Sequence, residues 1–326
     1  MNGVAEWARA EPLLRRSLDI DGARYGEDHP KVAVRLNNLA QLLKETNRLR
    51  EAEPLMKRTL KIDEASYGSD HPQVAIDLNN LAQLLQATNR LSEAESLMMR
   101  ALEIDQANYG ADDPHLTKCL NNLAGLFWAT NRLSTAELLL RRALRIDEAS
   151  LGPDHPQVAI EISNLAALLW TTSRPEEAEP LMRRALRIDE ASYGTLHPRV
   201  AVDLNNLATL LGTTNRVSEA ELLMVRAVRI EEATHGMLHP RVAIDLKNLA
   251  ALLRGSNRLN EAESLMRRAL EIFLVFTRSN HYEHPDLRAA TEAYIELQTA
   301  MSLPPTEILD KLRSLGPELL QFYPRE

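Results

Sequence analysis

Asparagine is the polar residue that returns most regularly in this chain. Pairs of asparagines stand inside a Leu-Asn-Asn-Leu-Ala motif that begins at Leu36 and recurs, with small changes, every 42 residues. An amide side chain donates and accepts hydrogen bonds at once, so a row of amides suits the alternating N–H and C=O groups of an extended peptide. The motif therefore predicts a peptide-binding row formed by Asn38, Asn79, Asn80, Asn121, Asn122, Asn164, Asn205, Asn206 and Asn248.

A structural role for the same amides is an equal alternative. The second asparagine of the motif is identical in all six repeats, although asparagine is only a mediocre helix former, so some interaction retains it. Each amide could hydrogen-bond to a neighbouring helix and set the spacing of the repeats. The two interpretations differ in the exposure that they predict for the side chains. Ser163 replaces the first asparagine in its repeat and would be a shorter polar group.

Two tryptophans, Trp128 and Trp170, stand one repeat apart at the same motif position. The other repeats carry Lys44, Gln86, Gly212 and Arg254 there, and nearby positions hold the small residues Gly125, Ala129, Ala167 and Thr171. We expect the two indoles to be neighbours in space and to line a shallow apolar pocket for an aromatic or aliphatic anchor. Packing in the core is the alternative, because large apolar side chains are usually buried.

Basic residues outnumber acidic ones at the positions expected to line a groove. Four cations and one anion fall there, namely Lys44, Lys118, Lys247, Arg254 and Glu45. A locally positive surface would steer an acidic peptide or a terminal carboxylate toward it, although any single lysine could be an ordinary solvated residue. The predicted partner is therefore a protein or peptide segment that is acidic or contains aromatic residues.

Histidine, cysteine and acidic residues do not form a recognisable catalytic or metal site. Most histidines occur once per repeat and so lie too far apart to share an ion; His71 or Asp113, each followed by proline, should cap the next helix or fix the loop. His281 and His284 with the glutamate between them make a weak metal cluster at best. Cys119 has no neighbouring base, and no glycine-rich phosphate loop is present. We predict no cofactor, no metal and no enzymatic activity.

The composition narrows the class of protein. The chain of 326 residues carries 38 Lys and Arg against 46 Asp and Glu, a formal charge of −8, which argues against a protein that coats nucleic acid. A single cysteine fits a reducing compartment. The apolar runs fall far short of the ~20 residues that span a bilayer. We therefore predict a cytoplasmic protein that binds neither nucleic acid nor membrane.

Each 42-residue unit carries apolar residues with a helical period. Val74, Leu78, Leu81 and Leu85 are three or four residues apart, and a second series of this kind follows in the same unit, which predicts two helices per unit. A single unit cannot bury its apolar stripe alone, so neighbouring units must stack. The predicted fold class is therefore all-α, a solenoid of helix pairs.

Residues at the ends of these helices predict where each one begins and stops. Pro72 should open a first helix, since its missing N–H costs nothing there, and this helix should end near Thr88. Ser92 and Glu95 should form a capping box at the start of the second helix, which Gly110 should close with a positive φ. Ser134 with Glu137 and Ser218 with Glu221 repeat the expected capping box.

Two series of arginines recur with the repeat. We expect them to pair with the recurrent glutamates and with C-terminal carbonyls, forming a salt-bridged ladder that belongs to the scaffold. The series are Arg48, Arg90, Arg132, Arg174, Arg216 and Arg258, and Arg58, Arg100, Arg142, Arg184, Arg226 and Arg268.

The repeating unit resembles the tetratricopeptide repeat (TPR). The 42-residue spacing, the His-Pro-x-Val-Ala start, the Leu-Asn-Asn-Leu-Ala core and the Glu-Ala-Glu segments are similar to the kinesin light chain subtype, which also occurs in bacterial multi-repeat proteins. The resemblance covers residues 8–284. It implies a right-handed α-α superhelix of antiparallel helix pairs whose first helices line a concave, peptide-binding groove. It does not imply cargo transport, because the heptad-rich region of a light chain is absent.

Both ends depart from the period. Residues 1–28 match the second helix of an incomplete repeat, as in a truncated chain; residues 29–280 hold six TPR units; residues 281–326 are expected to form capping helices, with Ala293 where the second asparagine would stand. A peptide-binding scaffold is the first interpretation. A self-associating assembly module, joined through the open N-terminal half-repeat, and a sensor fragment of a larger bacterial signalling protein stay open as alternatives.

Overall fold

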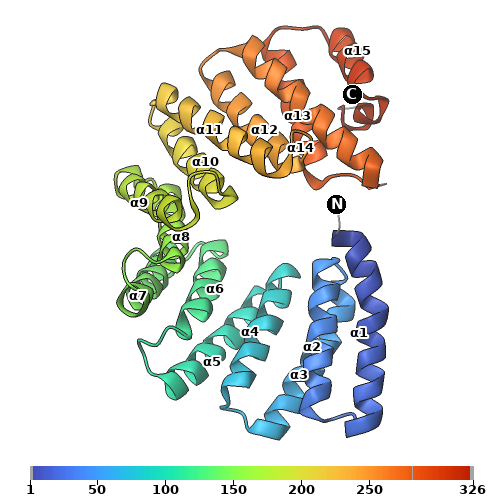
Figure 1. Ribbon diagram of the computed structural model, residues 1–326, viewed down its shortest axis with the longest axis vertical. Coiled ribbons are helices and arrows are strands. Elements are labelled where there is room, and N and C mark those ends of the chain that lie inside the picture. Colours follow the sequence, from blue (N-terminus) through green and yellow to red (C-terminus); the bar gives the residue numbers. More distant parts are fainter. Residues whose placement is uncertain (1–2, 281, 324–326) are drawn as a thin grey trace. The chain divides into compact units, whose positions relative to one another are not determined.

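A computed structural model describes residues 3–280 and 282–323, with side chains from residue 9 onward. Within these residues the chain forms fifteen α-helices and one 3-10 helix and contains no strand, which confirms the all-α prediction. The helices divide into two compact units, Met1–Pro153 and Asp154–Glu326 (Figure 1). His281, which the weak metal cluster requires, lies outside the described residues, as do residues 1, 2 and 324–326 of the expected terminal segments.

The first unit is a stack of helix pairs. Each first helix packs against the second helix of its own repeat, and that second helix packs against the next first helix. The helices are α1 (Gly3–Tyr25), α2 (Pro30–Glu45), α3 (Leu49–Tyr67), α4 (Pro72–Ala87), α5 (Leu91–Tyr109), α6 (Leu116–Ala129) and α7 (Leu133–Leu151).

The second unit shows the same pairing and ends with two shorter elements. Its helices are α8 (Pro156–Thr171), α9 (Pro175–Tyr193), α10 (Pro198–Thr213), α11 (Val217–His235), α12 (Pro240–Gly255), α13 (Leu259–Asn280), α14 (Pro285–Ala300), α15 (Pro305–Leu315) and the 3-10 helix η1 (Pro317–Phe322). Helix α15 lies in the segment expected to form capping helices, and it buries Ile308 and Leu312. The sequence did not indicate η1.

Histidine and proline start most first helices, as predicted. The His71 ring accepts a hydrogen bond from the backbone N–H of Gln73 at 3.1 Å through Nδ1, and Pro72 is the first helical residue. His29, His155, His197 and His239 make the same contact. Helix α6 differs, because Asp113 accepts from the His115 N–H at 2.9 Å and the helix begins only at Leu116. Asp113 therefore fixes the loop.

The predicted capping box of the second helices is wrong. Helix α5 begins at Leu91, one residue before Ser92, and its N-cap is Arg90, whose side chain makes no cap hydrogen bond. Ser92 therefore lies inside the first turn and cannot cap it. The same holds at α7 and α11, whose N-caps are Arg132 and Arg216. The predicted glycine ends are confirmed: Gly110 has φ 98°.

A left-handed residue between the two helices of each repeat explains why the second helix starts with arginine. Asn47 has φ 58°, a conformation that asparagine tolerates better than most residues, and the equivalent residues of the other five repeats share it. The Arg48 N–H then bonds to the Leu43 carbonyl at 2.8 Å. This bond closes the first helix, so the next helix has to begin directly after the arginine.

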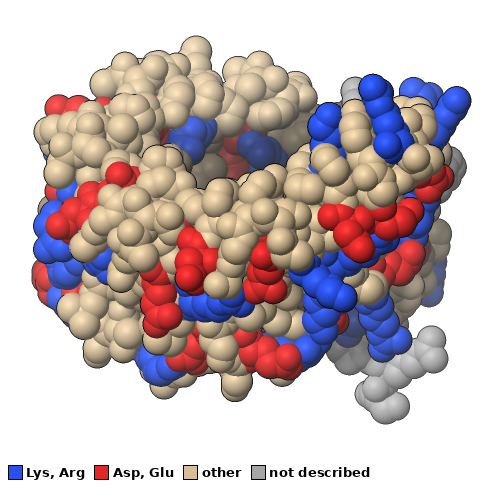
Figure 2. Space-filling model, turned by 90° about the horizontal axis from the view of Figure 1, so that it is seen from below, with Lys and Arg blue, Asp and Glu red and all other residues tan. Residues whose placement is uncertain are grey.

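The arginine ladder predicted from the sequence is present. Arg90 bonds Glu93 of its own helix and Glu53 of the preceding second helix at 2.6 Å each, and Arg258 joins Glu261 and Glu221 in the same way. Arg100, of the other series, bonds Glu64 and the Ser69 carbonyl. Figure 2 shows basic and acidic side chains interleaved over the face that it displays. Within the described residues no helix is long and apolar enough to cross a membrane.

Candidate peptide-binding surface

The amides of the Asn-Asn motif lie on the first helices, and they differ in exposure. The second asparagine is at least partly accessible in every repeat: it is exposed at Asn38 and Asn206, and half-buried at Asn80, Asn122, Asn164 and Asn248. The first asparagine lies deeper. Asn79 is only 6% exposed, whereas Asn121 and Asn205 are half-buried. The second position therefore offers more polar surface to a partner than the first.

In the first unit these amides bind each other across repeats. The Asn122 side chain donates through Nδ2 to the Oδ1 of Asn79 at 3.0 Å, and Asn80 donates to Asn37 at 3.4 Å. Each bond joins the second asparagine of one first helix to the first asparagine of the preceding one. An amide N–H satisfied in this way holds two helices together, because leaving the buried acceptor without a donor would cost free energy. The structural alternative for these amides is therefore supported in the first unit.

In the second unit the first-position residues turn to a carboxyl group instead. Asn205 of α10 donates through Nδ2 to the Oδ1 of Asp245 on α12 at 2.8 Å. Asn206, next to it in the chain, is exposed. Of the second-position amides of this unit, Asn206 therefore keeps more of its hydrogen-bonding capacity toward solvent than Asn80 and Asn122 do.

Trp170 lines a small pocket of the second unit, the Trp170 pocket. Its volume is about 70 Å³, and it is lined by Ser163, Ala167, Trp170, Met182, Asp203 and Asn206. Since one water occupies about 30 Å³ of liquid, this space is too small for an aromatic side chain. Trp128 is half-buried in the first unit. The predicted pairing of the two indoles joins residues of different units and stays a prediction.

A larger depression, the Gly212 hollow, lies further along the second unit. It has a volume of about 340 Å³ and is lined by Thr209, Gly212, Thr213, Asn215, Val217, Met224, Asn248, Ala251, Leu252 and Gly255. Ligand pockets begin at about 300 Å³, so the hollow has room for an aromatic side chain. We did not predict it from the sequence. The signal was Gly212 itself, since glycine stands where two other repeats carry tryptophan.

The basic residues expected to make the surface positive are only partly free. Lys247 lies 3.3 Å from Asp286 and Arg254 lies 2.9 Å from Glu296, both acids of α14. The sequence prediction considered only the six regular repeats, and α14 follows the last of them, so these two acids were not taken into account. The end of the second unit is therefore close to neutral at these two positions.

In the first unit two of the expected basic residues, Lys44 and Lys118, lie close enough for their charges to interact. Lys44 donates to Gln83 at 2.8 Å, and burial lowers the pKa of its ammonium group, with the nearby positive charge of Lys118 acting in the same direction. Lys118 itself is exposed on α6. These two residues keep the positive character that the sequence indicated.

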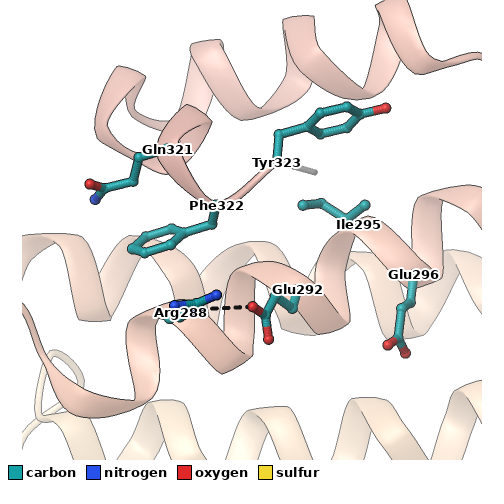
Figure 3. Close-up of a pocket in the computed structure, with 7 residues that line it drawn as sticks. All are labelled: Arg288, Glu292, Ile295, Glu296, Gln321, Phe322 and Tyr323. Atoms are coloured by element: carbon teal, nitrogen blue, oxygen red, sulfur yellow. Dashed lines mark hydrogen bonds and ion pairs between the residues drawn. The ribbon is translucent and has the colours of Figure 1, made fainter. Parts of the chain in front are cut away.

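A third pocket lies between α14 and the last described residues, away from the helices that carry the Asn-Asn motif. It has a volume of about 580 Å³ and is lined by Arg288, Glu292, Ile295, Glu296, Gln321, Phe322 and Tyr323 (Figure 3). Arg288 bonds Glu292 at 2.9 Å, so its charge is neutralised along its own helix. Sequence reasoning did not predict this pocket, because the chain after α15 has no repeat pattern.

Comparison with known proteins identifies the class. Tetratricopeptide repeat models match residues 4–65, 51–107, 78–149, 139–191 and 159–233, and a further model of the same repeat matches 246–273. These matches cover most of the chain, and the helix pairs agree with them. The chain belongs to the tetratricopeptide repeat family.

Among solved structures, this chain is similar in fold to kinesin light chain-like members of the family. BtubC (BKLC) from P. vanneervenii is 27% identical with a TM-score of 0.62, covering 73% of this chain and 94% of that one. A kinesin light chain protein of Podospora anserina with nearly identical TPR-like repeats is 22% identical with a TM-score of 0.56, covering 64% and 98%.

Yeast Tom70 shares the fold over 98% of this chain and 55% of its own, with a TM-score of 0.63 and 16% identity. No functionally curated protein matches this chain significantly in sequence.

Proposed function

We propose that this protein is an interaction scaffold, not an enzyme, and that it binds an extended peptide segment of a partner protein along the face of its first helices. TPR proteins in general bind other proteins. The observation that carries the proposal is the row of second-position asparagines, which is at least partly accessible in all six repeats. An amide side chain both donates and accepts hydrogen bonds, so it can bind the N–H and the C=O groups of a peptide backbone.

The second unit is the preferred place for a side-chain anchor. The Gly212 hollow includes Asn248 in its lining, so a main-chain contact and an anchor site lie together. Buried anchors in such hollows usually contribute most of the binding energy of an interface. An aromatic residue of the peptide fits the hollow. In the first unit, taken by itself, the exposed Lys118 would attract an acidic residue of a partner. A cytoplasmic location, suggested by the composition, belongs to this proposal.

The test is a selection followed by a double substitution. Dodecapeptides selected from a random library on the wild-type protein should lose affinity at least about tenfold for Asn206→Ala/Asn248→Ala, because each side chain is expected to bond the peptide backbone. The matched control is Asn260→Ala, which removes an exposed amide from the second helix α13 of the same unit, outside the Asn-Asn motif. Unchanged affinity of the double variant, measured by fluorescence anisotropy, would contradict the proposal.

Self-association is a second candidate function, favoured by the surface of α1. Leu13 is 67% exposed and Ile20 is 55% exposed on this helix. Two large apolar residues on one terminal helix could pack against a second copy of the chain. Light scattering over a concentration series tests this directly: a mass that stays at one chain at every concentration would remove the candidate, and Leu13→Glu should restore the monomer if a dimer forms.

A further inference from the structure

Carboxyl groups meet in pairs inside the helix stack. Asp63 of α3 and Asp77 of α4 are 3% and 2% exposed; Asp189 of α9 and Asp203 of α10 are 1% and 8% exposed. A third pair joins Glu231 of α11 and Asp245 of α12, at 3% and 6%. In every pair the second helix of one repeat provides one acid and the first helix of the next repeat provides the other, 14 residues later. The pairs therefore sit at the junctions between repeats.

The hydrogen-bonding environment of these pairs requires a proton. Both carboxyl oxygens of Asp77, the Oδ2 of Asp203 and the Oδ2 of Asp245 are buried without a donor. An ionised carboxylate only accepts hydrogen bonds, so two facing carboxylates leave these oxygens unsatisfied and repel each other. A proton on one carboxyl supplies the missing donor to the other and removes one charge. A buried pair in this setting is stable only when it holds that proton.

Neighbouring charges compensate the three pairs to different degrees. The groups that face Asp63 and Asp77 are His71 and the amide of Gln73. The Asp189 carboxylate has a stronger partner, since Arg199 Nε lies 2.9 Å from it, and Ser163 bonds Asp203.

The third pair has several polar neighbours. His235 lies 2.8 Å from Glu231, Asn205 donates to Asp245 at 2.8 Å, and Arg241 also faces Asp245. The pair in the first unit is therefore the least compensated of the three.

Burial and the facing acid raise the pKa values of the first-helix acids Asp77, Asp203 and Asp245. Burial and, after it, the facing Asp63 together raise the pKa of Asp77 to about 8. Burial raises the pKa of Asp203 to about 7, with the charge of Asp189 second; burial also raises that of Asp245 to about 7, with Glu231 second. Burial raises the pKa of Asp63 as well, so the pair at Asp63 and Asp77 holds a shared proton near neutral pH.

Three other junctions hold different residues at the same two positions and so provide internal comparisons. Asp21 and Arg35 form an ion pair at 2.7 Å. Asp105 faces the buried thiol of Cys119, and its pKa is raised only to about 6, by burial. Phe273 and Leu287 fill the positions at the last junction with apolar, buried side chains. The carboxyl pair is thus a property of particular junctions and not of the repeat as such.

We infer that the carboxyl pairs act as proton-dependent clasps between repeats: each clasp is closed while one proton is shared between its two acids, and loss of that proton as the pH rises through the neutral range loosens the junction. The clasp joins the second helix of one repeat to the first helix of the next. Loosening it therefore changes the spacing of the first helices, and with it the face that they form.

The sign of the pH dependence follows from proton uptake. Acids of the unfolded chain release their protons near pH 4, whereas the pair at Asp77 keeps one up to about pH 8. The folded chain therefore holds more protons between these values. Stability of the junction is complete below about pH 4 and falls as the pH rises toward 8, by a factor of up to about ten in the opening constant per pH unit and per proton.

The test is amide hydrogen exchange of the full chain between pH 6 and pH 8, with peptides from α3 and α4 converted to opening constants. In the wild type the opening constant should rise about tenfold per pH unit as the proton is lost. Asp77→Asn replaces the acid with an amide of the same shape that cannot ionise, so the rise should disappear. Asp70→Asn, in the exposed loop before α4, is the matched control and should keep it. Equal slopes in the wild type and Asp77→Asn would overturn the inference.

A second variant tests the same idea by gain of function. Cys119→Asp places a carboxyl opposite Asp105, so the α5 and α6 peptides should acquire a pH dependence that the wild type shows more weakly. Failure of a folded Cys119→Asp protein to acquire it would contradict the clasp. Infrared spectroscopy of the wild type at pH 7 adds a measurement that needs no variant: the carbonyl band of a protonated carboxyl group should be present and should vanish above pH 9, and its absence at pH 7 would also overturn the inference.

Discussion

The two units use the same Asn-Asn motif in different ways. In the first unit the second asparagine of a repeat donates to the first asparagine of the preceding repeat, as Asn122 does to Asn79. In the second unit Asn205 donates to a buried acid, Asn206 is exposed, and a 340 Å³ hollow opens beside Asn248. One motif can therefore hold repeats together in one place and present polar groups to a partner in another, and the neighbours of each amide decide which role it has.

The largest predicted effect is a loss of peptide affinity when a bulky side chain fills the Gly212 hollow. In Gly212→Trp the added Cβ meets only the mobile end of Leu252, at 2.8 Å from Cδ1, so the helix can remain while the indole occupies the hollow. Selected peptides should lose about thirtyfold or more in affinity, as expected when a hot spot worth about 2 kcal/mol is blocked. Gln86→Trp, at the same helix position of the first unit, should leave their affinity unchanged. Equal losses in both variants would erase the distinction between the units.

Substitution of the asparagines should have a smaller effect, on stability, and this effect should be greater in the first unit than in the second. Asn122→Ala leaves the buried partner Asn79 without its donor and should lower the free energy of unfolding by about 1–3 kcal/mol. Asn206→Ala removes an exposed group and should change it by less than about 0.5 kcal/mol. Urea denaturation followed by circular dichroism measures both. If Asn206→Ala proves as costly as Asn122→Ala, the amides of the second unit are structural too.

The smallest effect should come from the arginine ladder, which both units share. Arg132→Ala in the first unit and Arg216→Ala in the second each remove exposed ion pairs, with Glu95 and with Glu179 and Glu219. Their small destabilisation should be equal and should vanish in high salt, because salt screens exposed charges.

The ladder also has a pH signature opposite to that of the clasps. The hydrogen bond from Arg132 lowers the pKa of Glu95, so its contribution is present above pH 4.5 and is lost as the pH falls. If Arg132→Ala and Arg216→Ala differ strongly in thermal denaturation, the arginine ladder contributes unequally to the two units, which would contradict this prediction.

The repeat itself made most of the fold predictable. Proline after histidine, glycine at the helix ends and the spacing of leucines each act within a few residues, so Pro72, Thr88 and Gly110 were placed correctly from the sequence. The capping box failed for a local reason that the motif concealed: Asn47 and its equivalents adopt a left-handed conformation, which moves the helix start ahead of the serine.

The candidate site was less predictable, because its features depend on contacts between repeats. The Gly212 hollow exists only because a missing side chain meets the small residues of the next helix. The acids that neutralise Lys247 and Arg254 come from α14, beyond the period. Asp63 and Asp77 stand 14 residues apart on separate helices, and nothing in their local sequence marks them as a pair. Long-range packing decides each of these features.

The most direct test of the account maps where a peptide binds. Hydrogen exchange of the full chain with and without a library-selected peptide should show protection on α10 and α12 of the second unit, around Asn206, Gly212 and Asn248. Little change is expected on the second helix α13, which contributes no residue to the Gly212 hollow. Protection confined to the second helices, or to the pocket between α14 and Tyr323, would contradict the claim that the first-helix face is the binding surface.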